Sequence, residues 1–170
     1  MIDALAPGPV VLLGVSLGAA VALQEAAADD RITGVVAVDT FADLRTVATH
    51  RAPRYLTHAL IQRAFEEAER AGHFRVDAVS PVEAARRIRV PVLLIHGAAD
   101  RETPPDGSRL VFEALAGPRQ LLLIPGAGHT RSLQSDRAWH VIDGWLERMI
   151  AVNPRTANRE PVNHGEPVNP

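Results

Sequence analysis

The sequence predicts a three-layer α/β fold, in which helices cover both faces of a mostly parallel sheet of about four strands. Four short runs rich in Val, Ile and Leu lack polar alternation, which is typical of strands buried on both faces of a parallel sheet. These runs are Val10–Leu13, Val35–Val38, Val90–Ile95 and Leu121–Ile124. Helical patterns lie between them, and an alternating strand-helix order favours a layered α/β domain.

Each expected helix has a physical start or stop signal. An Ala-rich segment follows a Gly-containing turn, two segments carry an apolar stripe at helical spacing, one begins with Ser-Pro-x-Glu, and one stops at Gly-Pro. In chain order the expected helices are Leu17–Ala28, Pro53–Ala71, a short helix from Ser80, Pro104–Leu115 and Asp136–Ile150.

The composition excludes several kinds of chemistry. The chain has 170 residues, of which 46% are apolar, so one domain with a substantial core is expected. It contains no Cys, and all 18 basic residues are Arg, which excludes thiolate and Lys-dependent sites. The seven His show no metal-ligand spacing, and the formal net charge of -2 does not favour nucleic acid. We therefore expect no metal, no cofactor and no nucleic-acid partner.

The predicted domain occupies residues 1–152, and a Pro- and Asn-rich segment at residues 153–170 is predicted to be a disordered tail. An apolar stretch from Pro9 to Leu23 is too short to span a bilayer. No positive charge precedes it, as a secretory signal requires, so we expect a cytoplasmic protein without a membrane span.

The candidate nucleophile is Ser16, in the motif Gly14-Val15-Ser16-Leu17-Gly18 between the first strand and an Ala-rich helix. A sharp strand-to-helix turn needs small residues around the Ser, and it places the hydroxyl at a helix N-terminus. There the Leu17 N–H can stabilise a developing oxyanion. The alternative is that Ser16 is an ordinary N-cap.

Two further candidates follow the third and fourth predicted strands. Asp100 and His129 come after turns at the carboxyl ends of those strands, where binding sites of parallel sheets lie. A Ser hydroxyl needs a base and the base needs an orienting acid, so Ser16, His129 and Asp100 form a candidate triad. Asp100 could instead be only a turn residue, and Asp39, after the second strand, is a rival acid. We expect His96, at a strand end, to be structural.

These motifs resemble the α/β-hydrolase superfamily, with the closest likeness to its prolyl-oligopeptidase and S33-aminopeptidase branch. The resemblance rests on the Ser16 motif, on Pro91–Gly97 with Asp100 after it, and on Pro125–His129. It implies a serine hydrolase that cleaves a carboxylic ester, thioester or amide of a small molecule through an acyl-enzyme on Ser16. It also implies that residues 41–80 form a short helical lid over a small apolar pocket.

The resemblance further implies that this chain corresponds to the C-terminal half of the family fold. The first four strands and the loop donating a second oxyanion N–H are then absent, and Val10–Leu13 becomes a bare apolar edge strand. Three hypotheses follow: a working serine hydrolase, a truncated and catalytically impaired relative, or a non-enzymatic interaction module. An exposed edge strand pairs with another strand or aggregates, so we expect a homodimer through Val10–Leu13.

Overall fold

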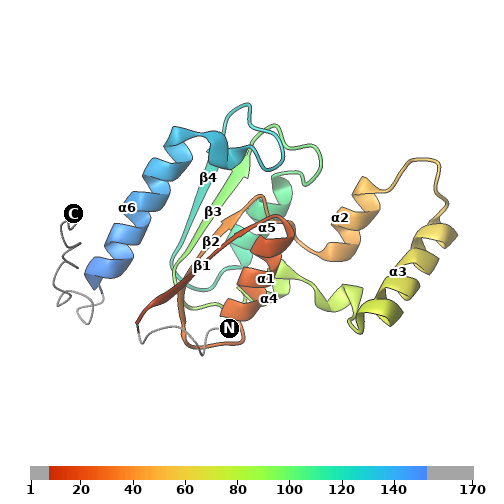
Figure 1. Cartoon of the computed structure of the whole chain (residues 1–170), viewed down its shortest axis with the longest axis horizontal. Helices are drawn as coiled ribbons and strands as arrows, with labels where there is room; N and C mark the ends of the chain where they lie inside the picture. Colours follow the sequence, from red (N-terminus) through yellow and green to blue (C-terminus); the bar gives the residue numbers. More distant parts are fainter. Residues whose placement is uncertain (1–7, 153–170) are drawn as a thin grey trace, which may run out of the picture.

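The computed structural model describes residues 8–152 of the chain, and it contains one four-stranded parallel sheet (Figure 1). The expected tail at residues 153–170 lies outside the described residues. The strands are β1 (Val10–Val15), β2 (Ile32–Val38), β3 (Val92–Gly97) and β4 (Arg119–Ile124). They lie in the order β1-β2-β3-β4, each parallel to its neighbours. The predicted fold class is therefore confirmed.

The apolar runs form strands because their side chains are buried on both faces. Along β2 and β3 alternate residues belong to two separate apolar clusters, one on each face of the sheet. Val35 and Leu94 point into the first cluster, whereas Val36 and Leu93 point into the second. A strand with two buried faces gains burial energy from every residue, which explains the absence of polar alternation.

Helices on both faces of the sheet complete the three layers (Figure 1). The first cluster is covered by α1 (Leu17–Ala26), α4 (Pro81–Ala85) and α5 (Asp106–Ala114). The second is covered by α6 (Asp136–Val152), which contributes its apolar side, including Ile142 and Trp145. The Ser80 hydroxyl accepts a hydrogen bond from the N–H of Glu83 at 3.3 Å, so the predicted cap of α4 is present.

The segment between β2 and β3 carries two helices that project from the body of the domain (Figure 1). They are α2 (Leu44–Arg51) and α3 (His58–Gly72). A short 3₁₀ turn at Val76–Ala78 follows α3 in the same segment, and another lies at Ser132–Gln134, before α6. The helix expected over Pro53–Ala71 was wrong at its start: α3 begins at His58. Thr57 is its N-cap, and the Thr57 hydroxyl accepts a hydrogen bond from the N–H of Leu60.

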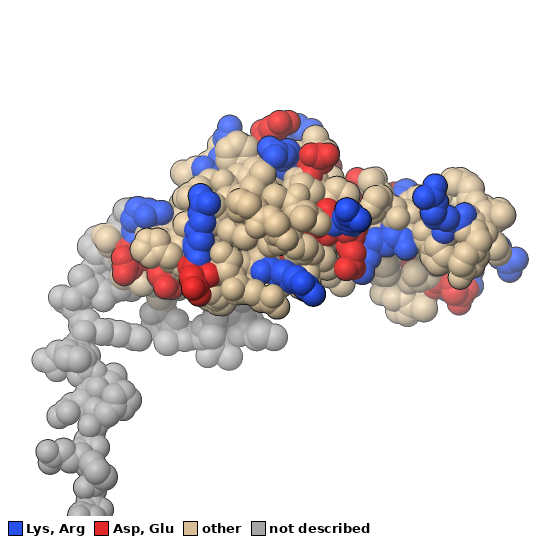
Figure 2. Space-filling view, turned by 90° about the horizontal axis from the view of Figure 1, so that it is seen from above, with Lys and Arg blue, Asp and Glu red and all other residues tan. Residues whose placement is uncertain are grey.

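One edge of the sheet is formed by β1, which pairs only with β2 among the described strands. Its residue Leu13 keeps 47% of its surface exposed. Arg and acidic side chains are interspersed over the face drawn in Figure 2. Several ion pairs join such side chains in the structure, including one between Arg45 and Asp77. Among the helices within residues 8–152, none has both the length and the apolar character needed to cross a membrane.

Candidate active site

Ser16 occupies a strained turn between β1 and α1. Its φ of 54° and ψ of -115° are unfavourable for a residue with a side chain, so the surrounding structure must hold this conformation. A Cβ on Gly14 would lie 2.3 Å from the carbonyl oxygen of Gly18, so only glycine permits the close approach of the strand end to the helix start. Ser16 is the N-cap residue by position, but its side chain makes no capping hydrogen bond.

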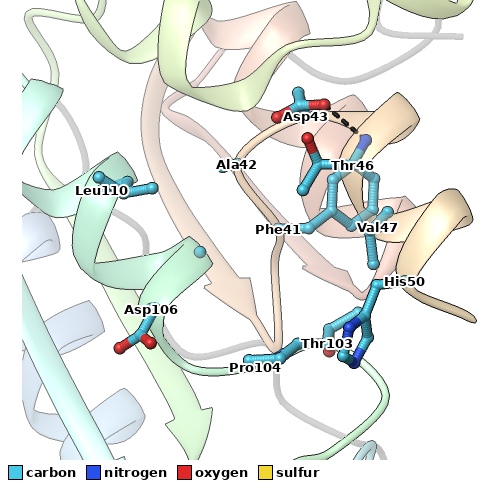
Figure 3. Close-up of a pocket in the computed structure, with 11 residues that line it drawn as sticks. Phe41, Ala42, Asp43, Thr46, Val47, His50, Thr103, Pro104, Asp106 and Leu110 are labelled. Carbon is cyan, nitrogen blue, oxygen red and sulfur yellow. Dashed lines mark hydrogen bonds between the residues drawn. The ribbon is translucent and has the colours of Figure 1, made fainter.

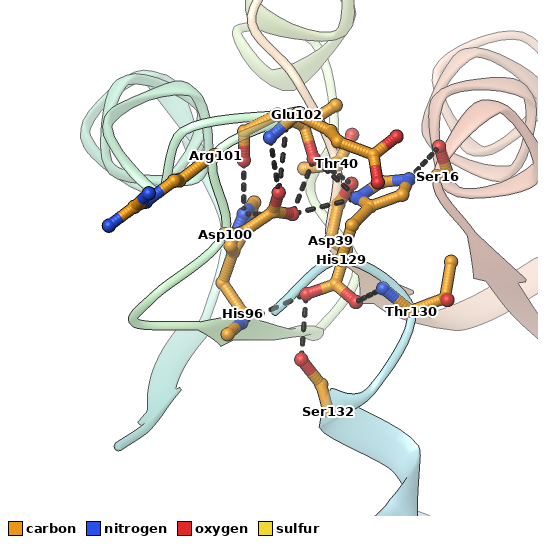
Figure 4. Close-up of polar contacts among 12 residues, drawn as sticks. Ser16, Asp39, Thr40, His96, Asp100, Arg101, Glu102, His129, Thr130 and Ser132 are labelled. Carbon is orange, nitrogen blue, oxygen red and sulfur yellow. Dashed lines mark hydrogen bonds and ion pairs between the residues drawn. The ribbon is translucent and has the colours of Figure 1, made fainter. Parts of the chain in front are cut away.

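The structure brings the Ser16 hydroxyl, the His129 imidazole and the Asp100 carboxylate into one chain of contacts (Figure 4). His129 Nε2 lies 3.1 Å from Ser16 Oγ, and His129 Nδ1 lies 2.7 Å from Asp100 Oδ2. A carboxylate only accepts hydrogen bonds, so Nδ1 carries the proton and Nε2 is left to accept from the hydroxyl. The imidazole is thus held in the tautomer that a general base requires.

The Asp100 carboxylate is buried, yet it has a full set of hydrogen-bond donors. Oδ1 accepts from the backbone N–H groups of Glu102 and Thr103, at 2.8 and 3.0 Å. Oδ2 accepts from the Thr103 hydroxyl at 2.7 Å as well as from His129. Burial raises the pKa of Asp100, but the hydrogen bonds from Thr103, His129 and Glu102 outweigh it and hold that pKa below its usual value. Asp100 is therefore both a turn residue and the partner of His129.

Thr103 is a residue of this site that the sequence analysis missed. Its hydroxyl oxygen lies 2.8 Å from His129 Nδ1, and the residue is 1% exposed. Its carbonyl oxygen lies 2.7 Å from Nε2 of the buried His96, whose Nδ1 lies 2.7 Å from the hydroxyl of Ser108. His96 is thus fully paired inside the protein, which agrees with the structural role expected for it. The Asp-x-x-Thr spacing of Asp100 and Thr103 is typical of a turn closed by side chains, and it was the sequence signal from which the role of Thr103 could have been predicted.

Asp39, the rival acid, makes no hydrogen bond to His129 among the contacts of the described residues. Its carboxylate instead accepts from the N–H of Gly97, the N–H of Thr130 and the hydroxyl of Ser132, at 2.9, 3.0 and 2.7 Å (Figure 4). The acid in contact with His129 is therefore Asp100.

A metal ion does not fit the same cluster well. Asp39, Asp100 and His129 each offer one ligand atom, and these atoms all lie within 4.8 Å of one another. However, each oxygen of both carboxylates already accepts a hydrogen bond from a backbone N–H or a hydroxyl group. His129 Nδ1 carries a proton and donates a hydrogen bond to Asp100, so it has no lone pair free for a metal ion. Binding a cation there would sacrifice these hydrogen bonds.

The expected oxyanion donor, the Leu17 N–H, stands at the first position of α1. The first four N–H groups of a helix have no acceptor within the helix, and they point toward the positive end of its dipole. The Leu17 N–H is therefore beside Ser16 at a place that favours negative charge.

Two adjoining hollows lie beside α2, and Ser16 lines one of them. The nucleophile hollow has a volume of about 320 Å³, and its lining is formed by Ser16, Leu17, Phe41, Leu44, Val47, Ala48, Arg51 and Thr103. The second hollow, of about 200 Å³, shares Phe41, Val47 and Thr103 with the first and extends past His50 and Leu110 (Figure 3). Among the aromatic residues of the segment 41–80, Phe41 lines both hollows. Tyr55 is 83% exposed, and Phe65 stacks under the guanidinium of Arg45 at 4.7 Å.

Comparison with protein families shows to which family this chain belongs. The model of the prolyl oligopeptidase family matches residues 4–152. The chain belongs to the prolyl oligopeptidase family. The resemblance proposed from the three motifs is therefore confirmed, and the family is one of hydrolases.

Relatives of known sequence give the same picture and show how much of them this chain covers. The uncharacterized protein YfhR of Escherichia coli K12 is 31% identical over 156 residues, which cover 88% of this chain and 48% of YfhR. YfhR of Escherichia coli O157:H7 is also 31% identical, with the same coverage. The chain thus spans about half the length of these relatives.

Solved structures similar to this one include a hydrolase, an esterase domain and a peptidase. Puromycin hydrolase superposes with a TM-score of 0.65 at 25% identity, over 84% of this chain and 22% of the hydrolase. The esterase domain of a Rhodothermus marinus protein gives a TM-score of 0.63 at 21% identity, over 86% of this chain and 64% of that domain. The acylaminoacyl peptidase of Pyrococcus horikoshii gives 0.63 at 17% identity, over 83% and 24%. The last two matches show the fold alone.

Proposed function

We propose that this chain carries the catalytic triad of a serine hydrolase that cleaves carboxylic esters of small molecules through an acyl-enzyme. Ser16 is the nucleophile, His129 the general base and then acid, and Asp100 the orienting acid. The observation that carries the proposal is the continuous run of contacts from Ser16 Oγ through both imidazole nitrogens of His129 to Asp100 Oδ2.

In the first half of the reaction, His129 Nε2 takes the proton of the Ser16 hydroxyl while Oγ attacks the ester carbonyl carbon. The imidazolium that forms lies against the ionised Asp100, whose lowered pKa keeps it negative. The carbonyl oxygen becomes an oxyanion near the Leu17 N–H. Collapse of the tetrahedral intermediate breaks the bond to the leaving group, which takes the proton from His129.

In the second half, water attacks the acyl-enzyme with His129 again acting as base, and Ser16 is regenerated. The nucleophile hollow, about 320 Å³ and lined largely by apolar residues, would receive the acyl or leaving group. The names of the similar structures, an esterase, a hydrolase and a peptidase, support acyl transfer as the reaction class. Esters are the least demanding substrates of such a site, since their leaving groups depart more readily than amines.

A fluorophosphonate probe tests the proposal, because it reacts covalently with activated serine hydroxyls. We expect labelling of the chain at Ser16, loss of labelling in Ser16→Ala, and turnover of p-nitrophenyl esters of graded acyl length. Equal labelling of the two proteins, or no labelling of the folded wild type, would overturn the proposal.

We also propose that copies of this chain associate through β1. The proposal is supported by the position of β1 at the edge of the sheet that residues 8–152 form, and by the exposure of Leu13. An apolar edge strand with unpaired backbone groups is a template for pairing with another strand.

A further inference from the structure

We propose that Asp39 is a positioning residue that anchors the loop carrying His129; this inference rests on the function proposed above. Asp39 follows β2, contacts neither Ser16 nor Asp100 by hydrogen bond, and acts through the residues that come after His129. Its task is to keep the imidazole between Ser16 and Asp100.

The order of the strands creates the need for such an anchor. Ser16 follows β1 and His129 follows β4, and these two strands are separated by β2 and β3. The loop after β4 must therefore reach across the ends of two strands to bring His129 to Ser16. Asp39 stands at the end of β2 and Gly97 at the end of β3, so both lie along the path that the loop crosses.

The Asp39 carboxylate joins three segments at that point. Oδ1 accepts from the Gly97 N–H at 2.9 Å and from the Ser132 hydroxyl at 2.7 Å, while Oδ2 accepts from the Thr130 N–H at 3.0 Å. Figure 4 shows the carboxylate between Thr130 and Ser132 and beneath His129. Asp39 and Ser132 are both completely buried. Hydrogen bonds to a buried carboxylate are among the stronger ones in proteins, so the loop is firmly tied to β2 and β3.

The backbone conformation next to His129 indicates that the hydrogen bonds to Asp39 hold a strained segment in place. Thr130 has a φ of 59°, and Asp39 itself has a φ of 51°, both in the left-handed region that residues with side chains rarely adopt. Such conformations persist where surrounding contacts determine them. The hydrogen bond from Thr130 to Asp39 is a contact of this kind, and it lies one residue from the catalytic imidazole.

An asparagine cannot replace Asp39 in this role. The carboxylate accepts at both oxygens, whereas a carboxamide has one accepting oxygen and one donating nitrogen. In one orientation its NH₂ faces the Thr130 N–H, and in the other it faces the Gly97 N–H. Either orientation breaks a backbone hydrogen bond of the anchor while the volume of the side chain stays the same.

The test compares D39N and S132A with T33V in the full chain. Thr33 lies at the opposite end of β2, where its hydroxyl donates to the Val10 carbonyl at 3.1 Å, so T33V removes a hydrogen bond remote from His129. We expect D39N to slow fluorophosphonate labelling of Ser16 on the order of a hundredfold, because a displacement of about 1 Å has that effect on a reacting group. S132A should slow labelling by a smaller factor, and T33V should leave it unchanged. Thermal unfolding verifies that each variant is folded.

A second measurement reads the imidazole directly and needs no activity. In ¹⁵N spectra of the histidine side chains, assigned with H129Q, wild-type His129 should show the single tautomer with the proton on Nδ1. In D39N and S132A we expect a mixture of tautomers or exchange broadening, which a loss of stability elsewhere does not produce. T33V should retain the wild-type spectrum.

The outcomes separate the anchor from the proposed function. If the folded wild type does not label, the hydrolase proposal fails, and the His129 spectra still test the anchor. If D39N does not fold, S132A decides, since it keeps the carboxylate and removes one hydrogen bond. A folded D39N, or in its absence a folded S132A, with wild-type labelling and a wild-type His129 spectrum would overturn the inference.

Discussion

His129 Nε2 lies 3.1 Å from Ser16 Oγ, although 113 positions separate the two residues in the chain. The two side chains follow the first and the last strands of the sheet, so their meeting depends on parallel strands that all end at one edge. Asp100 reaches His129 from the end of β3, and hydrogen bonds from its own turn hold it there. This arrangement leads to predictions for the stability, the labelling and the self-association of variants.

Gly14→Ala should destabilise the chain, whereas Gly18→Ala should not. A Cβ at position 14 would meet the backbone of Gly18 at 2.3 Å, and backbone atoms cannot move aside cheaply; a Cβ at position 18 has no atom within 4 Å. We expect G14A to lower the free energy of unfolding by about 3 kcal/mol. G18A should leave it unchanged or raise it by up to about 1 kcal/mol, because alanine favours helix. Urea unfolding of both variants measures the difference, and equal midpoints would contradict the close contact at the turn.

Thr103→Val should remove a hydrogen bond to the Asp100 carboxylate while nearly preserving the shape of the side chain at position 103. The variant loses the hydroxyl that donates to Asp100 Oδ2 at 2.7 Å. A hydrogen bond to a charged group contributes about 1.5 to 3 kcal/mol, so we expect the free energy of unfolding to fall by roughly that amount. Fluorophosphonate labelling should slow by about tenfold or more. Thr103→Ser retains the hydroxyl, and it should label faster than T103V; if both label as the wild type does, Thr103 does not support the acid.

Stability at acidic pH should depend on Asp100. Its pKa is lower in the folded chain than in the unfolded chain, so the unfolded state binds the proton first as the pH falls. The contribution of Asp100 is therefore complete above about pH 4, the usual value for an aspartate, and is lost as the pH falls through the folded-state value. Urea unfolding from pH 7 to pH 2 should show a shallower loss of stability in Asp100→Asn than in the wild type. Parallel curves for the two proteins would contradict the lowered pKa.

Leu13→Lys should abolish self-association if β1 pairs between copies. A charge on an edge strand opposes pairing with another strand, and Leu13 is 47% exposed on β1. Leu60→Lys is the matched control, since Leu60 is 51% exposed on α3, away from the strands. Light scattering should report a dimer or larger species for the wild type and for L60K, and a monomer for L13K. A monomeric wild type at high concentration would rule out association through this edge.

Much of the fold was predictable because it follows from local rules. Residues Val35–Val38 of β2 and Val92–Ile95 of β3 are apolar at every position, which is typical of strands covered on both faces. The α2 helix was not predicted as a separate element. Val47 is its sole buried residue, so its amphipathic pattern is weak, and its start depends on a hydrogen bond from the Thr46 N–H to the Asp43 side chain.

The candidate site was predictable only in part. Three residues, Ser16, Asp100 and His129, could be predicted from the sequence, because each follows a strand in a short turn and such turns meet at one edge of a parallel sheet. Thr103 and Ser132 were not, since their roles depend on which carboxylate each hydroxyl meets after folding. The position of Asp39 at the end of β2 was predictable, but only the three donors around its carboxylate distinguish an anchor from a second acid.

The strand order described above carries a consequence for how the sheet is made. Because the spatial order β1-β2-β3-β4 repeats the chain order, each strand after β1 pairs with the strand synthesised immediately before it. Within residues 8–152, no strand has to be inserted between two strands that are already paired. The sheet can therefore grow in the direction of synthesis, and the loop bearing His129 closes over an edge whose other components are already assembled.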